Sequence, residues 1–256
     1  MKKIFLLIIS AMLIHSFVDA SDDILATAYE SYTAGERAET FADRSAAFNE
    51  ALLLYSEAEK KYPSYGKLYY NIGNCYFHLG EYPHAIVYYN KALKLLPREK
   101  KIRHHLALSL KKAGVAPENP RYITTTLLFF HKVFSFKERS VLFTIFTVAA
   151  TALWSLFLWQ RRRRIKLIAL WFTALAAILF LSAMTSITTA HSRGIVIDPT
   201  VLRCDAGDHY KSVTAKPLLA GITVKILDAT DKAPWIKIAT PSGDIGYISI
   251  ELVEIM

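Results

Sequence analysis

The sequence Arg161-Arg162-Arg163-Arg164, followed after one intervening residue by Lys166, separates two long apolar runs. Val141–Trp159 contains nineteen residues without a charge, and Leu167–Met184 contains eighteen. An α-helix rises about 1.5 Å per residue, so each run is long enough to cross the roughly 30 Å hydrocarbon layer of a membrane. Since Lys and Arg beside such segments stay in the cytoplasm, the stretch predicts a transmembrane hairpin with a basic cytoplasmic turn. Two buried core helices are the alternative interpretation.

The positive charge of the chain is concentrated around these runs. The 256 residues carry a net charge of +9, and residues 121–191 hold nine bases and one acid. By contrast, residues 22–120 have a net charge of +1 and residues 192–256 a net charge of −1. The excess of positive charge is therefore typical of residues that flank membrane-spanning helices, and it does not indicate a nucleic-acid partner.

The N-terminus has the pattern of a secretory signal peptide. A basic start, Met1-Lys2-Lys3, precedes an apolar run at 4–14, and small residues end at Ala20. This pattern predicts cleavage after Ala20, with an uncleaved anchor as the alternative. Either outcome places the following residues outside the cytoplasm, in agreement with the cytoplasmic arginine turn.

Residues 22–116 are predicted to be helical, because apolar and aromatic side chains recur at spacings of three and four. A repeat of 34 residues begins at Gly66 and resembles the tetratricopeptide repeat. In that family the small residues Gly73 and Ala85 lie where the two helices cross, and Pro97 ends the second helix. The positions that match are Tyr69, Ile72, Gly73, Tyr76, Gly80, Tyr82, Ala85, Tyr89, Ala92 and Pro97.

The neighbouring units are less regular. Lys100–Gly114 fits the first helix of a following unit that has no second helix, so it is expected to cap the stack. Upstream, Asp22–Ala34 fits a first helix with Gly35 as its turn glycine. The next segment holds eleven more residues than the 34-residue pattern, which predicts a second helix lengthened at its N-terminus, starting near Thr40 or Asp43. A long loop is the alternative.

Charge is uneven within this region. Residues 22–59 hold nine acids and two bases, whereas residues 60–112 hold eleven bases and two acids. Such asymmetry orients a binding partner, or it pairs consecutive helices across their solvent edges, and both interpretations stay open.

Pro117–Pro120 is expected to end the helical region. The aromatic and basic residues that follow, up to residue 139, predict an interfacial helix on the membrane surface. Ser135 and Glu138 have the spacing of a capping box, which predicts that the first span starts there.

Residues 194–255 change to alternating Val, Ile and Thr with frequent turns, which predicts a small all-β domain that resembles a barrel. The segments carrying this pattern also resemble the bacterial SH3 family, although Leu202-Arg203-Cys204 and Tyr247 depart from the usual residues. The expected strands are Gly194–Ile197, Val201–Cys204, Thr223–Asp228, Trp235–Thr240 and Gly246–Ile248.

The order of these modules resembles the BatE family of the bacterial aerotolerance (Bat) operon. The resemblance implies an envelope complex with other Bat membrane proteins and a role in stress tolerance. It covers nearly the whole chain, and the order of the modules is its specific part.

The sequence contains none of the common catalytic or nucleotide-binding motifs, so we expect no enzyme activity, no cofactor and no metal site. The pair His104-His105 points apart on a helix, and a solvated face explains it. Cys75 and Cys204 lie in different predicted domains, and a disulfide between them is left open.

The binding surfaces are predicted from the resemblances. In a tetratricopeptide stack the first helices line the concave face, and a protein segment is expected to bind there. Asn71, Lys101 and His105 partly match a clamp for a peptide carboxylate, which is the narrower alternative. In the SH3-like domain Tyr210 and Tyr247 are candidate contacts, while Trp235 is assigned to the core. The candidates on the helical face are Tyr70, Asn71, Asn74, Phe77, His78, Lys101 and His105.

The sequence thus predicts a multi-domain protein of the bacterial inner membrane, with both soluble domains on the periplasmic side. The expected function is a non-enzymatic scaffold for envelope or membrane proteins. A cell-wall anchor or sensor that binds peptidoglycan is the alternative. The predicted order is a signal peptide (1–20), an all-α tetratricopeptide domain (21–116), a linker with an interfacial helix (117–139), transmembrane helices (140–160 and 167–187) around a basic turn (161–166), and an SH3-like barrel (188–256).

Overall fold

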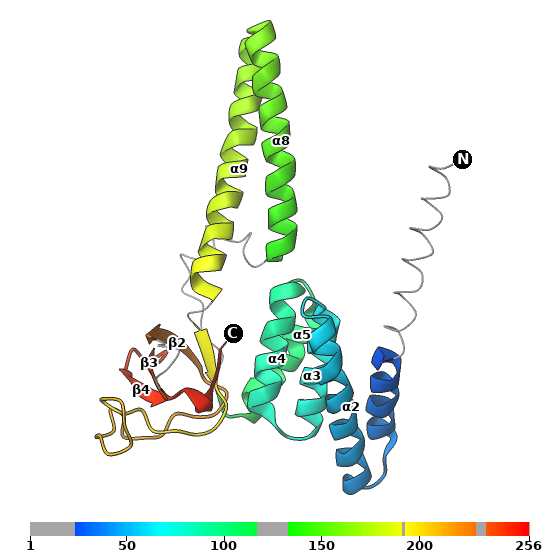
Figure 1. The fold of residues 1–256 in the computed structure, drawn as a ribbon, viewed down its shortest axis with the longest axis vertical. Helices are drawn as coiled ribbons and strands as arrows, with labels where there is room; N and C mark the ends of the chain where they lie inside the picture. The colour runs from blue at the N-terminus through cyan, green and yellow to red at the C-terminus, as the bar shows by residue number, and fades with distance from the viewer. Residues whose placement is uncertain (1–23, 117–132, 191–192, 229–233, 256) are drawn as a thin grey trace, which may run out of the picture.

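A computed structural model describes residues 24–116, 133–190, 193–228 and 234–255. The predicted signal peptide, the break at Pro117–Pro120 and the interfacial segment up to residue 132 lie outside these ranges. The described chain forms a helical region, a long helical hairpin that rises from one end of it, and a small β-sheet beside it (Figure 1).

The helical region contains a first helix at residues 24–37 and four further helices. The predicted lengthening is confirmed, because α2 has 21 residues and Thr40 caps it by accepting a hydrogen bond from the Asp43 backbone at 3.1 Å. Gly35 is not a turn glycine. It lies within the first helix, where a Cβ would come 2.9 Å from the Phe48 ring, so its small size permits the crossing of the two helices. The four helices are α2 (Phe41–Lys61), α3 (Gly66–His78), α4 (Tyr82–Leu95) and α5 (Lys100–Lys112).

The core of this region is centred on the crossing of α3 and α4. A Cβ on Gly73 would lie 2.7 Å from Tyr89, so the missing side chain provides the space for that ring. The fully buried Tyr89 hydroxyl donates to Asn74 Oδ1 at 2.8 Å, which satisfies both buried polar groups. The crossing predicted from the small residues is therefore present, and other buried residues around it are Phe48, Ala51, Tyr55, Leu68, Ile72, Cys75, Ala85 and Ala92.

The hairpin consists of α8 (Phe136–Gln160) and α9 (Arg163–Ala190). The predicted capping box is confirmed, since Ser135 and Glu138 each accept a backbone hydrogen bond from the other residue. The turn is shorter than expected: Arg161 closes α8 in a left-handed conformation with φ 51°, and α9 begins at Arg163. Arg164 and Lys166 thus lie in the first turn of α9 and not in a loop.

The two helices of the hairpin are long and apolar enough to cross a membrane. They contact each other through small buried residues, Ala150 on α8 and Ala169 and Ala176 on α9, which let the backbones approach closely. Many of their large apolar side chains are exposed, such as Val148 and Leu158 at 63% and 69%, although Phe146 of α8 pairs with Phe172 of α9 between the helices. A helix pair with an apolar exterior is expected where the surroundings are apolar.

The C-terminal region is an antiparallel sheet of five strands in the order β4-β3-β2-β1-β5. Its core is formed by the inward side chains Val196, Leu202, Val224, Ile236, Ile238 and Ile248. Before the last strand the chain makes one short 3₁₀ turn, η1 (Ile250–Leu252). The strands are β1 (Arg193–Val196), β2 (Thr223–Asp228), β3 (Trp235–Ala239), β4 (Ile245–Ser249) and β5 (Val253–Ile255).

Two expectations about this sheet are corrected. Val201–Cys204 is not a strand, because residues 200–203 make only isolated bridges, such as that between Arg203 and Tyr247. The sheet is also not closed, since β4 and β5 are its two edges and do not pair with each other. The strand at Val253–Ile255 was not expected, because three residues carry too little alternation to be recognised from sequence.

Candidate interaction surfaces

Aromatic rings gather on the face formed by the first helices of the repeat units. His78, at the end of α3, stacks on Phe48 of α2 with ring centroids 4.7 Å apart. Its Nε2 lies 3.4 Å from the Tyr32 hydroxyl on the first helix. The predicted site residue His78 is therefore held by two neighbouring helices while its own surface stays exposed.

A second group of rings surrounds His105 on α5. Its ring lies 5.5 Å from Tyr70 and 6.2 Å from Phe77, both on α3, and 5.8 Å from Tyr89 on α4. Three of the predicted contact residues, Tyr70, Phe77 and His105, are thus brought together, each half-buried. These rings join α3 to α5, and each of the three side chains stays partly exposed.

The two candidate asparagines, Asn71 and Asn74, differ in burial and in their hydrogen-bond partners. Asn74 is buried and accepts from Tyr89, so it serves the core of the repeat. Asn71 is half-buried, and its amide donates to the Tyr55 hydroxyl at 3.3 Å. Of the residues in the suggested carboxylate clamp, Lys101 is fully at the surface, whereas Asn71 and His105 are engaged with neighbouring side chains.

Partial burial shifts the pKa of several groups on this face. It lowers the pKa of His78 and of His105 from the ordinary value of 6.5, because a charged imidazole loses hydration there. The charges of His104 and His78 lower the pKa of His105 further. Burial also raises the pKa of Cys75 to about 12, so that thiol stays protonated at neutral pH and is not a nucleophile. Cys75 and Cys204 are both free.

Arg203 links the two predicted contact residues of the C-terminal region. Its guanidinium donates to the Tyr210 carbonyl at 3.0 Å, and its backbone pairs with Tyr247 through bonds of 2.9 and 2.7 Å. Lys237 lies 5.7 Å from the centroid of the Tyr247 ring. Tyr210 and Tyr247 are thus both hydrogen-bonded to Arg203, and both are half-buried.

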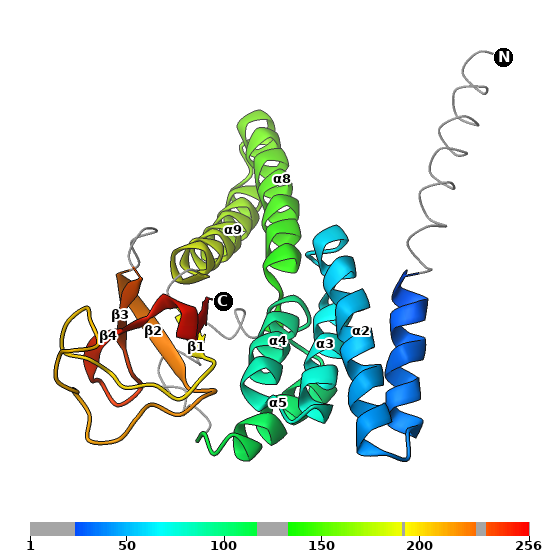
Figure 2. The same cartoon turned by 60° about the horizontal axis from the view of Figure 1, so that its bottom comes forward.

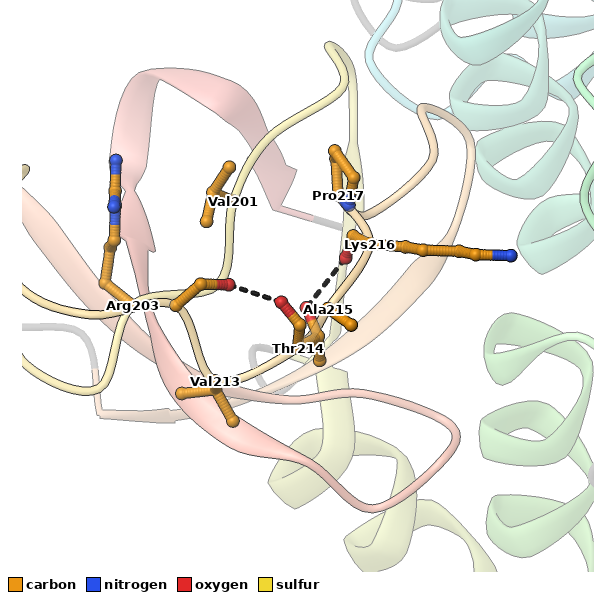
Figure 3. Close-up of a pocket in the computed structure, with 8 residues that line it drawn as sticks. Val201, Arg203, Val213, Thr214, Ala215, Lys216 and Pro217 are labelled. Carbon is orange, nitrogen blue, oxygen red and sulfur yellow. Dashed lines mark hydrogen bonds between the residues drawn. The ribbon is translucent and has the colours of Figure 1, made fainter.

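A shallow cavity of about 560 Å³ lies beside Arg203 (Figure 3). The Thr214 hydroxyl donates to the Lys216 carbonyl at 2.8 Å and shapes the turn that forms one wall. Lys216 extends away from the other residues drawn, so its charge does not point into the hollow. The apolar part of the lining comes from Val201, Val213, Ala215 and Pro217.

The sheet packs directly against the helical region, and sequence reasoning missed this contact. Ile86 and Val87 on α4 and Ile195 on β1 are all fully buried together. Leu106 and Leu110 of α5, Ala113 directly after that helix, and Ile197 complete the cluster. Figure 2 shows the sheet beside α4 and α5, at the last of the described helices of the helical region. The β-region therefore closes the end of the helical stack.

Polar and close-packed contacts surround this cluster. Lys91 on α4 forms an ion pair with Glu254 on β5 at 2.6 Å and lies 4.0 Å from Glu59 on α2. Gly221, with φ +91°, approaches α4 so closely that a Cβ would lie 2.8 Å from Ile86. The feature of the sequence that could have indicated this contact is the pair Ile86-Val87, which gives α4 a second apolar face outside the repeat pattern.

A further contact joins the helical region to the hairpin. Arg98, which follows α4, forms an ion pair with Glu138 in the first turn of α8. The Arg98 guanidinium also lies 5.5 Å from the centroid of the Phe134 ring. The start of the hairpin is thereby attached to one defined end of the helical region.

Comparison with known families supports one part of this description. Residues 66–99 match the family model of the tetratricopeptide repeat, so the chain contains this repeat, with α3 and α4 as its two helices. No curated protein matches the chain. Among the described residues, no group of three or more His, Cys, Asp or Glu side chains is placed to hold a metal ion. The tetratricopeptide repeat is in general a protein-interaction module, which indicates binding to another protein.

Proposed function

We propose that this protein is a non-enzymatic scaffold, anchored by α8 and α9 in a bacterial inner membrane, that presents its repeat to partner proteins in the periplasm. The observation that carries the proposal is the combination of a tetratricopeptide repeat with a helix pair whose exterior is apolar. The ion pair between Arg98 and Glu138 supports a fixed attachment of the repeat to the anchor.

The narrower parts of the proposal rest on the order of the modules. That order supports assignment to the BatE family, with other Bat membrane proteins as partners in aerotolerance. The five-stranded antiparallel sheet is compatible with an SH3-type domain. In this proposal the sheet caps the repeat through Ile195 and Glu254, and the face with His78 and His105 binds the partner.

The topology is tested with the two native cysteines, since Cys204 is exposed and Cys75 is buried. A membrane-impermeant maleimide is applied to spheroplasts that contain the full chain. We expect Cys204 to be labelled without permeabilisation, whereas a cysteine introduced as Arg162→Cys should be labelled only after lysis. Labelling with the reverse dependence would refute the periplasmic placement.

Partner binding is tested by site-specific photo-crosslinking in cells. Crosslinkers replace His78 or Phe77 on the predicted face, and Leu53 on the exposed side of α2 serves as the matched control. We expect discrete adducts with membrane proteins from the first two positions and none from Leu53. Equal adducts at all three positions would show that this face is not the binding surface.

A further inference from the structure

One end of the helical region carries most of its basic residues. Neighbouring helices run in opposite directions, so α2 and α4 end where α3 and α5 begin (Figure 1). Two separate segments of sequence, residues 60–67 and 94–103, are thereby brought to the same end. We call it the basic end, and it consists of Lys60, Lys61, Lys67, Lys94, Arg98, Lys100, Lys101 and Arg103.

All eight side chains of the basic end are exposed. Four carboxylates lie nearby: Glu57 and Glu59 near the end of α2, Glu99, and Glu138, which is engaged with Arg98. The opposite end of the same helices is mixed in charge, since Glu36, Asp43 and Glu81 are found there with Lys111 and Lys112. Excess positive charge is therefore a property of one end and not of the whole region.

The basic end lies at the point where the hairpin begins. Arg98 contacts both Glu138 and the Phe134 ring, so the end of α4 lies beside the first turn of α8. The apolar exterior of α8 starts at the same level, with Phe136 and Val141 about half exposed. If α8 enters a bilayer there, the cations lie at the depth of the phosphate groups, directly outside the hydrocarbon layer.

We propose that the basic end binds the phosphate groups of anionic phospholipids on the membrane surface where α8 and α9 enter. This inference rests on the proposed function, because it requires the hairpin to span the bilayer. Each Lys or Arg near an anionic surface increases association by about five-fold, so several cations together are sufficient to hold the repeat against the lipid. The partner-binding face with His78 would then have a constant orientation relative to the membrane.

The test uses the full chain in nanodiscs of phosphatidylcholine, with or without phosphatidylglycerol, and mass spectrometry of lysine acetylation. We expect Lys60, Lys61, Lys67, Lys100 and Lys101 to react at least about three-fold more slowly when phosphatidylglycerol is present. Lys111 and Lys112, at the other end of α5, are the internal control and should not change. Salt should remove the protection, because screening weakens interactions between exposed charges.

A matched pair of variants tests whether the lysines of the basic end cause the lipid-dependent protection. Replacing the five protected lysines with Gln should abolish the lipid-dependent protection measured by hydrogen exchange at the N-terminus of α5, whereas K111Q/K112Q should retain it. Inorganic phosphate added to phosphatidylcholine discs should protect no lysine, since the proposal concerns a lipid surface.

Equal acetylation in both lipid compositions, or equal protection at both ends of α5, would overturn the inference. Slow hydrogen exchange throughout α8 and α9 reports that the hairpin is inserted. An inserted hairpin without lysine protection therefore contradicts only the lipid contact, whereas rapid exchange in the hairpin contradicts the membrane anchor itself.

Discussion

The helix pairs α3–α4 and α8–α9 are alike where their helices touch and opposite on their outer surfaces. In the first pair Gly73 makes room for Tyr89, and in the second Ala150 and Ala176 let the helices approach. The outer surface of α3–α4 is polar, with Lys67 exposed, whereas the outer surface of α8–α9 is apolar. Small residues at a helix contact therefore do not reveal the surroundings of a helix pair.

The two helix pairs also differ in where their charged residues lie. Arg139, in the first turn of α8, is 4% exposed and donates to both the backbone and the side-chain oxygen of Ser182 on α9 at 2.9 Å. In α3–α4 charged side chains lie outside and the core is apolar, apart from Asn74. Arg139 is thus paired inside a helix pair with an apolar exterior, as a polar group would need to be if lipid, which supplies no water, surrounds that pair.

The largest expected effect tests the contact within α3–α4. Tyr89→Ala removes a fully buried ring and should lower the free energy of unfolding of the helical region by about 3–5 kcal/mol. Tyr89→Phe keeps the ring and leaves Asn74 without its donor, so a loss of about 1–3 kcal/mol is expected. Hydrogen exchange of α3 and α4 in the full chain measures both, and equal losses would contradict the role given to the ring.

The second prediction compares two side chains of equal exposure. Val148 on α8 and Leu53 on α2 are each 63% exposed. Val148→Lys should oppose membrane insertion by about 2.5–3.5 kcal/mol, because the charge would face lipid. Leu53→Lys faces water and should change stability by less than about 0.5 kcal/mol.

Alkaline extraction of membranes and the thermal midpoint of the helical region provide the two measurements. If Val148→Lys remains in the membrane fraction as completely as Leu53→Lys, the apolar exterior of the hairpin does not face lipid. The comparison between the two helix pairs would then lose its basis.

A smaller effect is expected at the polar contact inside the hairpin. Ser182→Ala removes one of the acceptors for Arg139 and should destabilise the helix pair by about 0.6 kcal/mol, and by no more than about 1.7. Ser140→Ala is the matched control, since the Ser140 hydroxyl bonds only to Phe136 of its own helix at 3.0 Å. Trp154 fluorescence during thermal unfolding in micelles follows the pair, and a control loss equal to that of Ser182→Ala would contradict the interhelical role.

The smallest expected effect is a dependence on pH. Burial lowers the pKa of His78 and His105 in the folded state below the unfolded value of 6.5, so the unfolded chain binds protons more readily. Stability should be complete above pH 6.5 and should decrease as the pH falls from there through the folded-state pKa values. In the double variant His78→Gln/His105→Gln, the urea concentration at the unfolding midpoint should depend less on pH over this window. An unchanged pH dependence would show that these two histidines do not cause it.

Several features were predictable because local sequence determines them. The 34-residue spacing placed Gly73 against the aromatic position of α4, and the eleven extra residues predicted the long α2 with a start near Thr40 or Asp43, of which the structure selects Thr40 as the cap. The capping box at Ser135 was likewise visible, because its partners are three residues apart. Residues 66–99 then matched the tetratricopeptide family.

The candidate binding residues were predictable only as members of one helical face. Their partners were not visible, because Asn74 accepts from Tyr89 on another helix and His78 stacks on Phe48, thirty residues away in sequence. The open sheet was missed for a similar reason. Strand number is readable from alternation, whereas closure depends on pairing between distant strands, and β4 and β5 do not pair.

The sequence by itself determined the helical repeat, the apolar hairpin with its arginine turn and the presence of a β-region, since each depends on residues close together in the chain. Only the tertiary structure decided that the sheet closes the helical stack at Ile86 and Ile195, and that the cations of residues 60–67 and 94–103 lie at one end, where Arg98 contacts the start of α8. Both arrangements join residues far apart in sequence, and no local spacing encodes which distant surfaces come into contact.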